Sequence, residues 1–330
     1  KQFLQLIQLL ENKYKISIFS FSSGQLKKHF LKFNVSLKIC NYPGFRIFSL
    51  ILFLLKNEAD IYHFFLPKSY IIGGILTFFS RKKKIMSRRS LNNYHKKYLY
   101  LSKFVEKILH KKMDFILVNS SAIKNQLAKT EGVPISKIKV IPNFKLETNN
   151  IPIIKSFGAS KVKFGYVANF IKYKRHLTLI EICSKLKVRK KWELLLIGSS
   201  KNQLRKKVKD RIKLLKLEKN VKIFEGRDNI DFFYKKIDFA ISTSEEEGSS
   251  NFLLEAISNA LPIIAFDVGG NKDFFHKNGY LVRKNNFTEF QKSVEEMIDS
   301  RKSLAFKKNS LALSSKKFNN KNSLNKNFES

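Results

Sequence analysis

Short apolar runs rich in β-branched and aromatic residues alternate with helical patterns along nearly the whole chain of 330 residues. Apolar strands that alternate with helices favour parallel sheets, because a crossover helix must join each strand to the next and cover a face of the sheet. We therefore expect an α/β fold. At roughly 150 residues per domain, the length predicts two doubly wound domains.

The expected elements divide between two halves of the chain. In the first half the expected strands are 15–21, 61–65, 84–87, 115–119 and 138–141, and the expected helices are 69–80, 95–112 and 121–130. In the second half the expected strands are 162–167, 193–197, 221–224, 237–242 and 262–266, and the expected helices are 176–186, 201–217, 251–260 and 288–300.

The segment 143–160 interrupts this alternation because it is polar and carries Pro152. It predicts an interdomain linker. We expect one domain over 1–150, a second over 151–305 and a polar basic tail over 306–330, with a last helix at 303–313. Two doubly wound domains would face each other across a cleft at the carboxyl ends of their strands, where such folds bind ligands.

Charge is the unusual part of the composition: 64 Lys and Arg stand against 26 Asp and Glu, for a net charge of +38. Such a charge favours phosphates, nucleic acid or anionic lipid surfaces, although a compositional bias toward Lys, Asn, Ile and Phe accounts for part of it equally well. Cys40 and Cys183 are too few for a disulfide framework or a zinc cluster, which indicates a cytoplasmic protein. The apolar runs 47–55 and 70–79 are too short to span a bilayer.

The most informative segment is 242–273, STSEEEGSSNFLLEAISNALPIIAFDVGGNKD. Here a strand leads through an acidic loop and Gly248-Ser249-Ser250 into a helix that begins near Asn251. A helix opened by a Gly-Ser-Ser turn presents backbone N–H groups and a positive dipole end to an anion such as a diphosphate. Glu255 lies inside an otherwise apolar helix, where a carboxylate needs a partner such as the hydroxyls of a ribose. The simpler alternative is that Glu255 faces solvent and Glu247 is a loop residue without a functional role.

A second anion feature follows the first strand of the second domain. The strand ends in Gly165-Tyr166-Val167-Ala168-Asn169-Phe170, and Lys174-Arg175-His176 comes one short loop later. Lys174 can reach a phosphate as a point charge, although a solvated surface lysine is the alternative. Both features project from carboxyl ends of strands in one domain, which favours a shared site.

The stretch EGSSNFLLEAISNALPIIAFDVGG, with Glu247 and Glu255 in an E-x7-E spacing, resembles the retaining GT-B glycosyltransferases of family 4, also called group 1. The resemblance is strong over about 162–300 and implies two Rossmann-like domains. It also implies that Glu247 contacts the donor sugar and Glu255 the ribose, and that Lys174 and the backbone at 249–251 neutralise the diphosphate.

The wider set of site residues implied by the resemblance has catalytic and donor-binding members. Glu247 and Lys174 are the catalytic candidates, and the donor-binding candidates are Asn169, Ser249, Ser250, Asn251, Phe252 and Glu255. Family members often carry Arg where this chain has Asn169, so Lys174 would carry more of the phosphate charge. The resemblance implies no metal and no cofactor, and a front-face mechanism without a protein base. The family's first strand and glycine loop are not found, so we expect the chain to lack an amino-terminal part.

A basic, aromatic segment, 81–112, carries twelve Lys or Arg and one acid, Glu106. It suits an anionic membrane surface or a polyprenyl-phosphate-linked acceptor, and Arg88, Arg89, Lys96 and Lys97 are its candidates for the acceptor or membrane side. A solvated helix face is the alternative. His63 is a candidate for either packing or the acceptor side. Nucleic-acid binding is disfavoured, since no recognised motif is present.

Together these features predict transfer of a sugar from a nucleotide sugar to a glycan or lipid-linked acceptor, in synthesis of cell-surface polysaccharide or lipopolysaccharide. The second domain would bind the donor and the first the acceptor, with the protein peripheral at the inner face of the cytoplasmic membrane. The alternatives are a GT-B-fold nucleotide-sugar epimerase and a non-catalytic basic protein that binds phosphate or nucleic acid.

Overall fold

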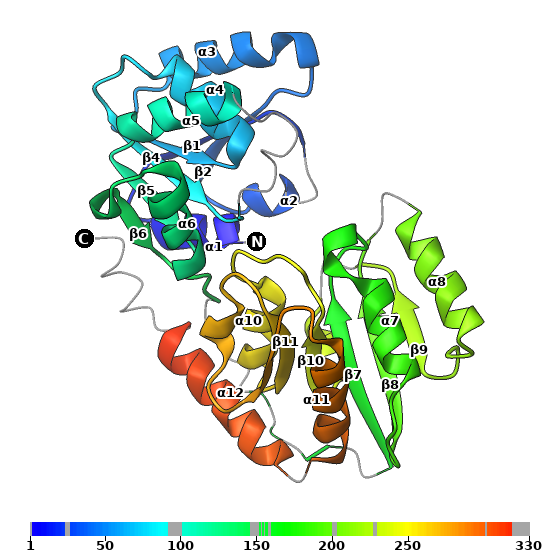
Figure 1. The fold of residues 1–330 in the computed structure, drawn as a ribbon. Helices are drawn as coiled ribbons and strands as arrows, with labels where there is room; N and C mark the ends of the chain where they lie inside the picture. Colours follow the sequence, from blue (N-terminus) through cyan, green and yellow to red (C-terminus); the bar gives the residue numbers. More distant parts are fainter. Residues whose placement is uncertain are drawn as a thin grey trace. The chain divides into compact units, whose positions relative to one another are not determined.

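The structure is a computed structural model that describes residues 2–23, 27–91, 101–145, 152, 154, 156–157, 160–199, 203–226, 230–300 and 302–318. The chain forms two compact units. Unit 1 comprises Lys1–Val118 and Lys124–Val140, and unit 2 comprises Asn119–Ile123 and Ile141–Ser330. Figure 1 shows the elements of each unit in chain order.

Unit 1 contains two parallel sheets. The first pairs β1 (Ile16–Ser20) with β2 (Val35–Ile39), and the second has the order β3 (Ile61–Phe65), β4 (Lys83–Arg88), β5 (Phe115–Val118), β6 (Ile138–Val140). The helices are α1 (Gln2–Leu10), α2 (Lys27–Phe30), α3 (Arg46–Lys56), α4 (Pro67–Leu76), α5 (Leu101–Lys112) and α6 (Ser121–Glu131), with short 3-10 turns at η1 (Pro43–Phe45) and η3 (Ile135–Lys137).

Unit 2 is built on one six-stranded sheet in which all strands are parallel. The strand order is β12 (Gly279–Arg283), β11 (Ile263–Asp267), β10 (Phe239–Ser242), β7 (Lys161–Val167), β8 (Lys191–Ile197), β9 (Val221–Phe224). After β7 the chain adds β8 and β9 on one side of it, and then returns to its other side to add β10, β11 and β12. In doubly wound sheets such a reversal of strand order marks the ligand-binding crevice, at the carboxyl ends of the two strands concerned, which here are β7 and β10.

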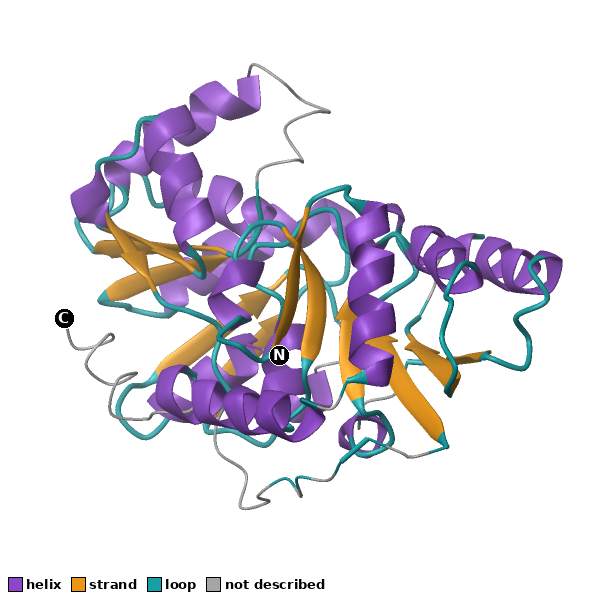
Figure 2. Ribbon diagram, turned by 60° about the horizontal axis from the view of Figure 1, so that its bottom comes forward, coloured by secondary structure: helices purple, strands orange, loops and turns teal. Residues whose placement is uncertain are grey.

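Helices cover the sheet of unit 2. They are α7 (His176–Ser184), α8 (Leu204–Leu214), α9 (Asp231–Tyr234), α10 (Asn251–Ser258), α11 (Phe287–Asp299) and α12 (Ser303–Lys317), with 3-10 turns at η4 (Lys172–Lys174) and η5 (Asn271–Phe274). α7 packs with α8 and α11, while α10 packs with α12. Figure 2 shows the helices against the strands. Within the described chain, none of the helices is long and apolar enough to cross a membrane.

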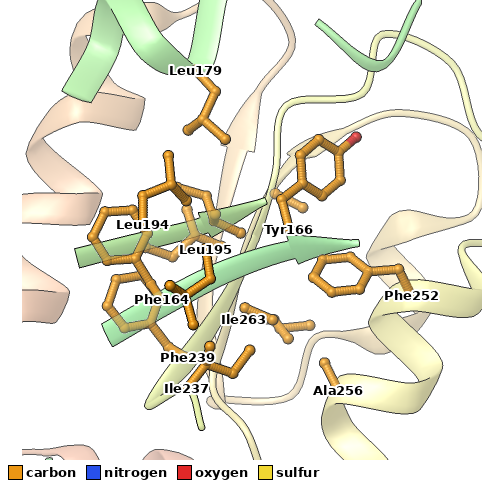
Figure 3. Packing of buried hydrophobic residues seen from close by; sticks show 14 of the residues in the cluster. Phe164, Tyr166, Leu179, Leu194, Leu195, Ile237, Phe239, Phe252, Ala256 and Ile263 are labelled. Carbon is orange, nitrogen blue, oxygen red and sulfur yellow. The ribbon is translucent and has the colours of Figure 1, made fainter. Parts of the chain in front are cut away.

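The core of unit 2 explains why its strands are nearly all apolar. Phe164, Leu194, Phe239 and Ile263 come from four adjacent strands and are 0% exposed, and Figure 3 shows them stacked across the sheet. Phe164 and Phe239 stack with ring centroids 4.9 Å apart. Strands covered on both faces have no polar side to alternate with, as continuous apolar runs predict.

The alternation confirmed the α/β class, and the expected strands agree with the observed ones to within about three residues at either end. The structure adds β2, α3 and β12, for which no element was expected. The expected helix at 303–313 is confirmed as α12, which extends to Lys317 into the expected polar tail. α12 packs on α10, where the Ser258 and Ser314 hydroxyls lie 2.8 Å apart. Composition could not show that Ser314, within the expected tail, faces another helix.

Candidate functional site

The candidate site lies in unit 2, in the two loops that follow β7 and β10. These strands pair directly in the sheet, with Phe164 opposite Phe239. The β7 loop carries Asn169 and Lys174, and the β10 loop carries Glu247 and leads into α10. The topology of unit 2 therefore brings both anion features of the sequence to the crevice described above.

Hydrogen bonds to backbone groups hold the two loops together. The Thr243 hydroxyl lies 3.2 Å from the carbonyl oxygens of both Lys174 and Arg175 and shares its one proton between them. The Glu245 amide donates to the Tyr173 carbonyl at 2.7 Å, and the Tyr166 hydroxyl donates to the Lys174 carbonyl at 3.3 Å. Burial raises the pKa of Tyr166, which keeps its hydroxyl protonated as a donor. Lys174 is thus fixed at its backbone from the neighbouring strand.

The side chains of Lys174 and Glu247 meet. Lys174 Nζ donates to Glu247 Oε1 at 2.5 Å, and their side chains are 17% and 11% exposed. The ammonium also lies 5.2 Å from the centre of the Tyr173 ring. The two residues that sequence reasoning selected as catalytic candidates form one partly buried ion pair.

A second ion pair supports the same loop. Arg175 has a left-handed backbone (φ 52°), and its Nη2 lies 2.8 Å from Glu245 Oε1 while its Nε donates to Glu245 Oε2 at 3.2 Å. Its Nη1 also donates to the side chain of Asn285 at 2.6 Å. Sequence reasoning noted Arg175 but gave it no partner, since Glu245 is 70 residues away.

The start of α10 is capped and held from the side. The Ser250 hydroxyl accepts the Leu253 N–H at 3.3 Å, as an N-cap serine does. Asn143 Nδ2 donates to the Ser249 carbonyl and to Asn251 Oδ1, each at 3.0 Å. Helix geometry directs the first-turn N–H groups along the axis, so this end of α10 can receive an anion. Asn143, at the start of the expected linker, was not recognised as a support of the site.

Two glycines after β11 allow the β10 loop to take its path. A Cβ on Gly269, whose φ is 56°, would lie 1.6 Å from the Glu247 carbonyl oxygen, and one on Gly270 would lie 2.5 Å from the Gly248 carbonyl oxygen. The Gly270 amide donates to that Gly248 carbonyl at 3.0 Å. Only glycine permits such an approach, so the pair sets the position of the Glu247 backbone.

Glu255 is buried, at 6% exposed, and accepts a hydrogen bond from the Tyr234 hydroxyl at 2.8 Å on Oε2. Burial, together with the Glu255 carboxylate, raises the pKa of Tyr234 well above its ordinary value, so the phenol stays a donor. The solvent-facing alternative for Glu255 is therefore wrong. Tyr234 belongs to the four-residue helix α9, which carries no motif that could have identified it.

The remaining donor-binding candidates have structural roles that the sequence did not predict. Asn169 Oδ1 accepts the Ser199 hydroxyl at 2.9 Å, which ties the β7 loop to the end of β8. The Phe252 side chain is 7% exposed and packs against Tyr166, with ring centroids 5.5 Å apart, as Figure 3 shows. Phe252 can therefore present its backbone, but not its ring, to a ligand.

His176, the first residue of α7, follows the Lys174 loop. Its ring is 1% exposed and stacks on Tyr166 and on Phe170, with centroids 5.1 Å and 4.3 Å away. Burial lowers the pKa of His176 to about 4. The imidazole is thus a neutral packing element at physiological pH.

The structure describes two of the four basic residues expected on the acceptor or membrane side, Arg88 and Arg89. Arg88 is 5% exposed and forms a bidentate ion pair with Glu131, at 3.0 Å and 3.1 Å, which argues against a membrane contact and does not test a role toward an acceptor. The Arg89 guanidinium lies 5.8 Å from the Phe65 ring, and its burial lowers its pKa to about 10. Lys96 and Lys97 lie outside the described residues.

His63 belongs to the same edge of unit 1. Its Nε2 lies 2.8 Å from the Ser87 hydroxyl, and its ring centroid lies 4.4 Å from that of Phe65. Burial, with a smaller contribution from Arg89, lowers its pKa to about 3. These contacts favour the packing alternative for His63 without testing a role toward an acceptor.

One group of side chains among the described residues has a spacing that could hold a metal ion: Glu106, His110 and Glu131 in unit 1. Arg88 already contacts both acids, with Glu106 at 3.9 Å. A guanidinium next to these carboxylates opposes a cation there. The group is therefore better explained as a buried charge network between α5 and α6 than as a metal centre.

Comparison with known proteins supports the resemblance to glycosyltransferases over nearly the whole chain. The model for Glycosyltransferase Family 4 matches residues 3–144, and the model for Glycosyl transferases group 1 matches residues 149–311. An Anabaena protein, HepE, solved in complex with UDP and glucose, superposes with a TM-score of 0.82 at 18% identity, covering 99% of this chain and 94% of that one. The fold, the strand order and these matches define a glycosyltransferase of GT-B type.

The chain belongs to the group 1 glycosyltransferases. It is 26% identical over 201 residues to a Staphylococcus aureus poly(ribitol-phosphate) alpha-N-acetylglucosaminyltransferase, covering 56% of this chain and 39% of that relative. A Campylobacter jejuni enzyme, N-acetylgalactosamine-N,N'-diacetylbacillosaminyl-diphospho-undecaprenol 4-alpha-N-acetylgalactosaminyltransferase, is 26% identical over 207 residues, covering 61% of this chain and 55% of its own length. The matches thus span about two fifths to just over half of these relatives.

Proposed function

We propose that the protein transfers a sugar from a nucleotide-sugar donor to a glycan or lipid-linked acceptor, with retention of anomeric configuration, in synthesis of a cell-surface polysaccharide or lipopolysaccharide. The relatives support this class of reaction. The S. aureus enzyme is named for a poly(ribitol-phosphate) acceptor, the C. jejuni enzyme for a diphospho-undecaprenol acceptor, and HepE was solved with UDP and glucose.

The observation that carries the proposal is the Lys174–Glu247 ion pair, in the loops that flank the start of α10 at the topological switch point of unit 2. A diphosphate in this crevice meets one ammonium group and the amino end of a helix, which are complementary to its charge. Glu247 is then placed to accept hydrogen bonds from the sugar hydroxyls, and Glu255 from the ribose.

The chemistry follows from where charge develops. The bond between the anomeric carbon and the phosphate oxygen breaks, the acceptor oxygen forms its bond on the same face, and the acceptor proton passes to the departing phosphate oxygen. No protein base is needed for that transfer. Lys174 and the helix amides stabilise the negative charge that builds on the diphosphate, which is the term that lowers the barrier.

We propose that this stabilisation needs no divalent cation, because fixed positive charge is already positioned where a metal would act. Lys174 contributes a full charge and α10 contributes its dipole. The proposal predicts turnover that persists when divalent cations are removed with a chelator. Loss of turnover in chelator, with recovery on adding Mg²⁺ or Mn²⁺, would contradict it.

A nucleotide panel tests the function directly. The thermal unfolding of the full-length protein is measured with UDP, GDP, ADP and the corresponding nucleotide sugars, since a ligand at a hundred times its Kd raises the free energy of unfolding by about 2.7 kcal/mol. The nucleotide sugar that stabilises the protein is then incubated with acceptor, and release of nucleoside diphosphate is assayed. Release of an isomerised nucleotide sugar would indicate an epimerase instead, and binding without turnover a non-catalytic protein.

Single substitutions connect that assay to the site. Glu247→Gln and Lys174→Ala are expected to lower turnover by about two to three orders of magnitude. Lys172→Ala is the matched control, because it removes the same charge from the exposed position two residues earlier. Equal turnover in Lys174→Ala and Lys172→Ala would remove the assignment.

A further inference from the structure

The outward face of helix α3 in unit 1 is apolar. Ile47, Phe48, Ile51, Leu52 and Leu55 are between 36% and 75% exposed. Their spacing, i, i+1, i+4, i+5 and i+8, places them on one side of the helix. A helix at a water-facing surface normally turns polar residues outward, so this face is suited to a partner other than water.

The apolar surface continues into the turn before α3. Tyr42 and Phe45 are 76% and 67% exposed, on either side of Pro43 at the start of η1. From position 42 to position 55 the chain therefore exposes seven large apolar or aromatic side chains, the five named above together with Tyr42 and Phe45. We call these seven residues the α3 surface. Figure 1 shows α3 along the margin of unit 1.

Basic residues bound the α3 surface at both ends of the helix. Arg46 is the first residue of α3 and Lys56 the last, and the sequence between them contains no acid. Glu58 and Asp60 follow the helix, and Lys82 lies 3.7 Å from Asp60. Long basic side chains at the ends of an apolar helix can extend to lipid phosphates while the apolar face enters the bilayer.

The charge of the chain distinguishes between the possible partners. Residues 1–140 contain 26 Lys and Arg and 6 Asp and Glu, within a chain of net charge +38. Two copies of so basic a chain repel each other, which opposes dimerisation through this face. An anionic lipid surface attracts the chain, at about 1 kcal/mol for each basic residue near the surface.

We propose that the α3 surface is a membrane-binding element that lies in the interface of an anionic bilayer. With 11 residues, α3 is about 16 Å long at 1.5 Å per residue, roughly half the hydrocarbon thickness, so it lies along the membrane rather than across it. The aromatic and aliphatic side chains enter the boundary between headgroups and acyl chains, and the exposed Lys56 contacts the phosphates, whereas Arg46 is half-buried and donates to the Asn41 carbonyl.

This placement differs from the basic segment 81–112 that the sequence indicated. There Arg88 is buried in an ion pair, whereas α3 combines exposed apolar area with flanking cations. The binding free energy of such a membrane element has two contributions, insertion of apolar side chains and attraction between charges. Salt weakens the second contribution and not the first. The proposal does not depend on the sugar-transfer chemistry of unit 2.

Vesicle co-sedimentation of the full-length protein tests the proposal. Phosphatidylcholine vesicles with 30% phosphatidylglycerol are compared with pure phosphatidylcholine vesicles. We expect the protein to sediment with the anionic vesicles, to sediment less at 0.5 M salt, and still to exceed the background there because the apolar term is not screened. Sedimentation no greater than that of the protein alone would overturn the proposal.

Two matched triple variants distinguish binding through the α3 surface from nonspecific binding by exposed apolar residues elsewhere. Phe48→Ser, Leu52→Ser and Leu55→Ser together are expected to weaken binding about tenfold or more. The control removes three exposed apolar residues of unit 2, Leu214→Ser, Phe232→Ser and Leu304→Ser, and should bind as the parent does. Equal losses in both variants, or no loss in the first, would contradict the assignment. All six residues are exposed, so the fold should persist, and an unchanged far-UV circular dichroism spectrum and urea unfolding curve would verify it.

A tryptophan probe reports the depth of the helix. Trp192 is the one tryptophan of the chain, so Phe48→Trp in a Trp192→Phe background gives a single reporter on α3. We expect a blue shift of its emission and quenching by brominated lipids on adding anionic vesicles. An unchanged spectrum would exclude insertion. Lipid-independent dimerisation that the α3 triple variant abolishes would assign the surface to a second copy instead.

Discussion

The ammonium group of Lys174 lies 2.5 Å from the Glu247 carboxylate, although 73 residues separate the two positions in the sequence. Each belongs to a loop that follows one of two paired central strands. The pair keeps a cation and an anion in place inside a partly buried loop region before any ligand arrives. On the proposed function, a diphosphate bound here would draw Lys174 toward itself and release Glu247 toward the sugar.

A double-mutant cycle measures that coupling. Lys174→Met and Glu247→Gln should each lower kcat/KM strongly, and the double variant should lose less than the sum of the two losses. We expect an interaction energy of about 1–3 kcal/mol, because residues in contact are not energetically independent. The measurement is steady-state kinetics of the four proteins. Strict additivity would mean that the two groups act separately, and a cycle of Lys172 with Glu247 provides the additive reference.

Tyr234 is expected to position the Glu255 carboxylate. Tyr234→Phe removes a hydroxyl that donates to Oε2 and leaves the ring packed, so the carboxylate becomes less ordered and less well satisfied. We expect the KM for the nucleotide sugar to rise about tenfold while kcat changes little, and the free energy of unfolding to fall by about 1–3 kcal/mol. Kinetics and urea unfolding provide both numbers.

Tyr280→Phe is the matched control for Tyr234→Phe. Tyr280 also has its pKa raised by burial and by a neighbouring carboxylate, that of Glu296, but it belongs to β12 at the edge of the sheet. The control should leave the KM for the donor unchanged. A fall in kcat for Tyr234→Phe with an unchanged KM would show that the hydroxyl does not act through donor binding.

The sequence predicted the central strands of unit 2 well, because strands buried on both faces are uninterrupted apolar runs. It did not predict α3, whose run 47–55 is apolar on both sides and so has no helical period to detect. It also missed β2, where burial alternates over only five residues. An uninterrupted apolar run thus identifies a buried strand, but the same kind of run does not show that 47–55 is a helix, and five residues are too few for the alternation in β2 to stand out.

The sequence likewise predicted some residues of the candidate site and not the residues that contact them. The spacing of Glu247, in the turn before α10, and Glu255, inside α10, could be read from the sequence because those residues are close in it. Their partners, Lys174 and Tyr234, are 73 and 21 residues away from them. The burial of Arg88 was not predicted for the same reason, since a run of charges does not show which member meets a partly buried acid 43 residues later.

Substitution of Gly269 tests how tightly the β10 loop is fixed. In Gly269→Ala the new Cβ would overlap the Glu247 carbonyl oxygen, which is backbone and cannot turn away. We expect a loss of about 3 kcal/mol or more in the free energy of unfolding, of which the left-handed φ accounts for about 1–2. Turnover should fall as well, because Glu247 must move.

Gly132→Ala isolates the backbone part of that cost. Gly132 also has a positive φ, 69°, but a Cβ there would meet nothing within 4 Å. This variant should lose only about 1 kcal/mol and keep full activity. If Gly269→Ala were as mild as Gly132→Ala, the close approach to Glu247 would not be a constraint on the site.

His176 predicts how the stability of the protein depends on pH. Its pKa is about 4 in the folded protein, against 6.5 for an ordinary histidine, because its ring is buried. Between these values the unfolded chain binds a proton that the folded chain does not, so the free energy of unfolding falls as the pH falls through 6.5 toward 4. At pH 5 the loss from this residue is about 2 kcal/mol relative to pH 7 or above, where it vanishes.

His176→Gln should therefore flatten the decline measured by urea unfolding between pH 7 and pH 5, whereas His276→Gln, at an exposed position, should not. An equally steep decline in His176→Gln would mean that the imidazole accepts a proton in place, and that its stacking on Tyr166 and Phe170 does not keep it neutral.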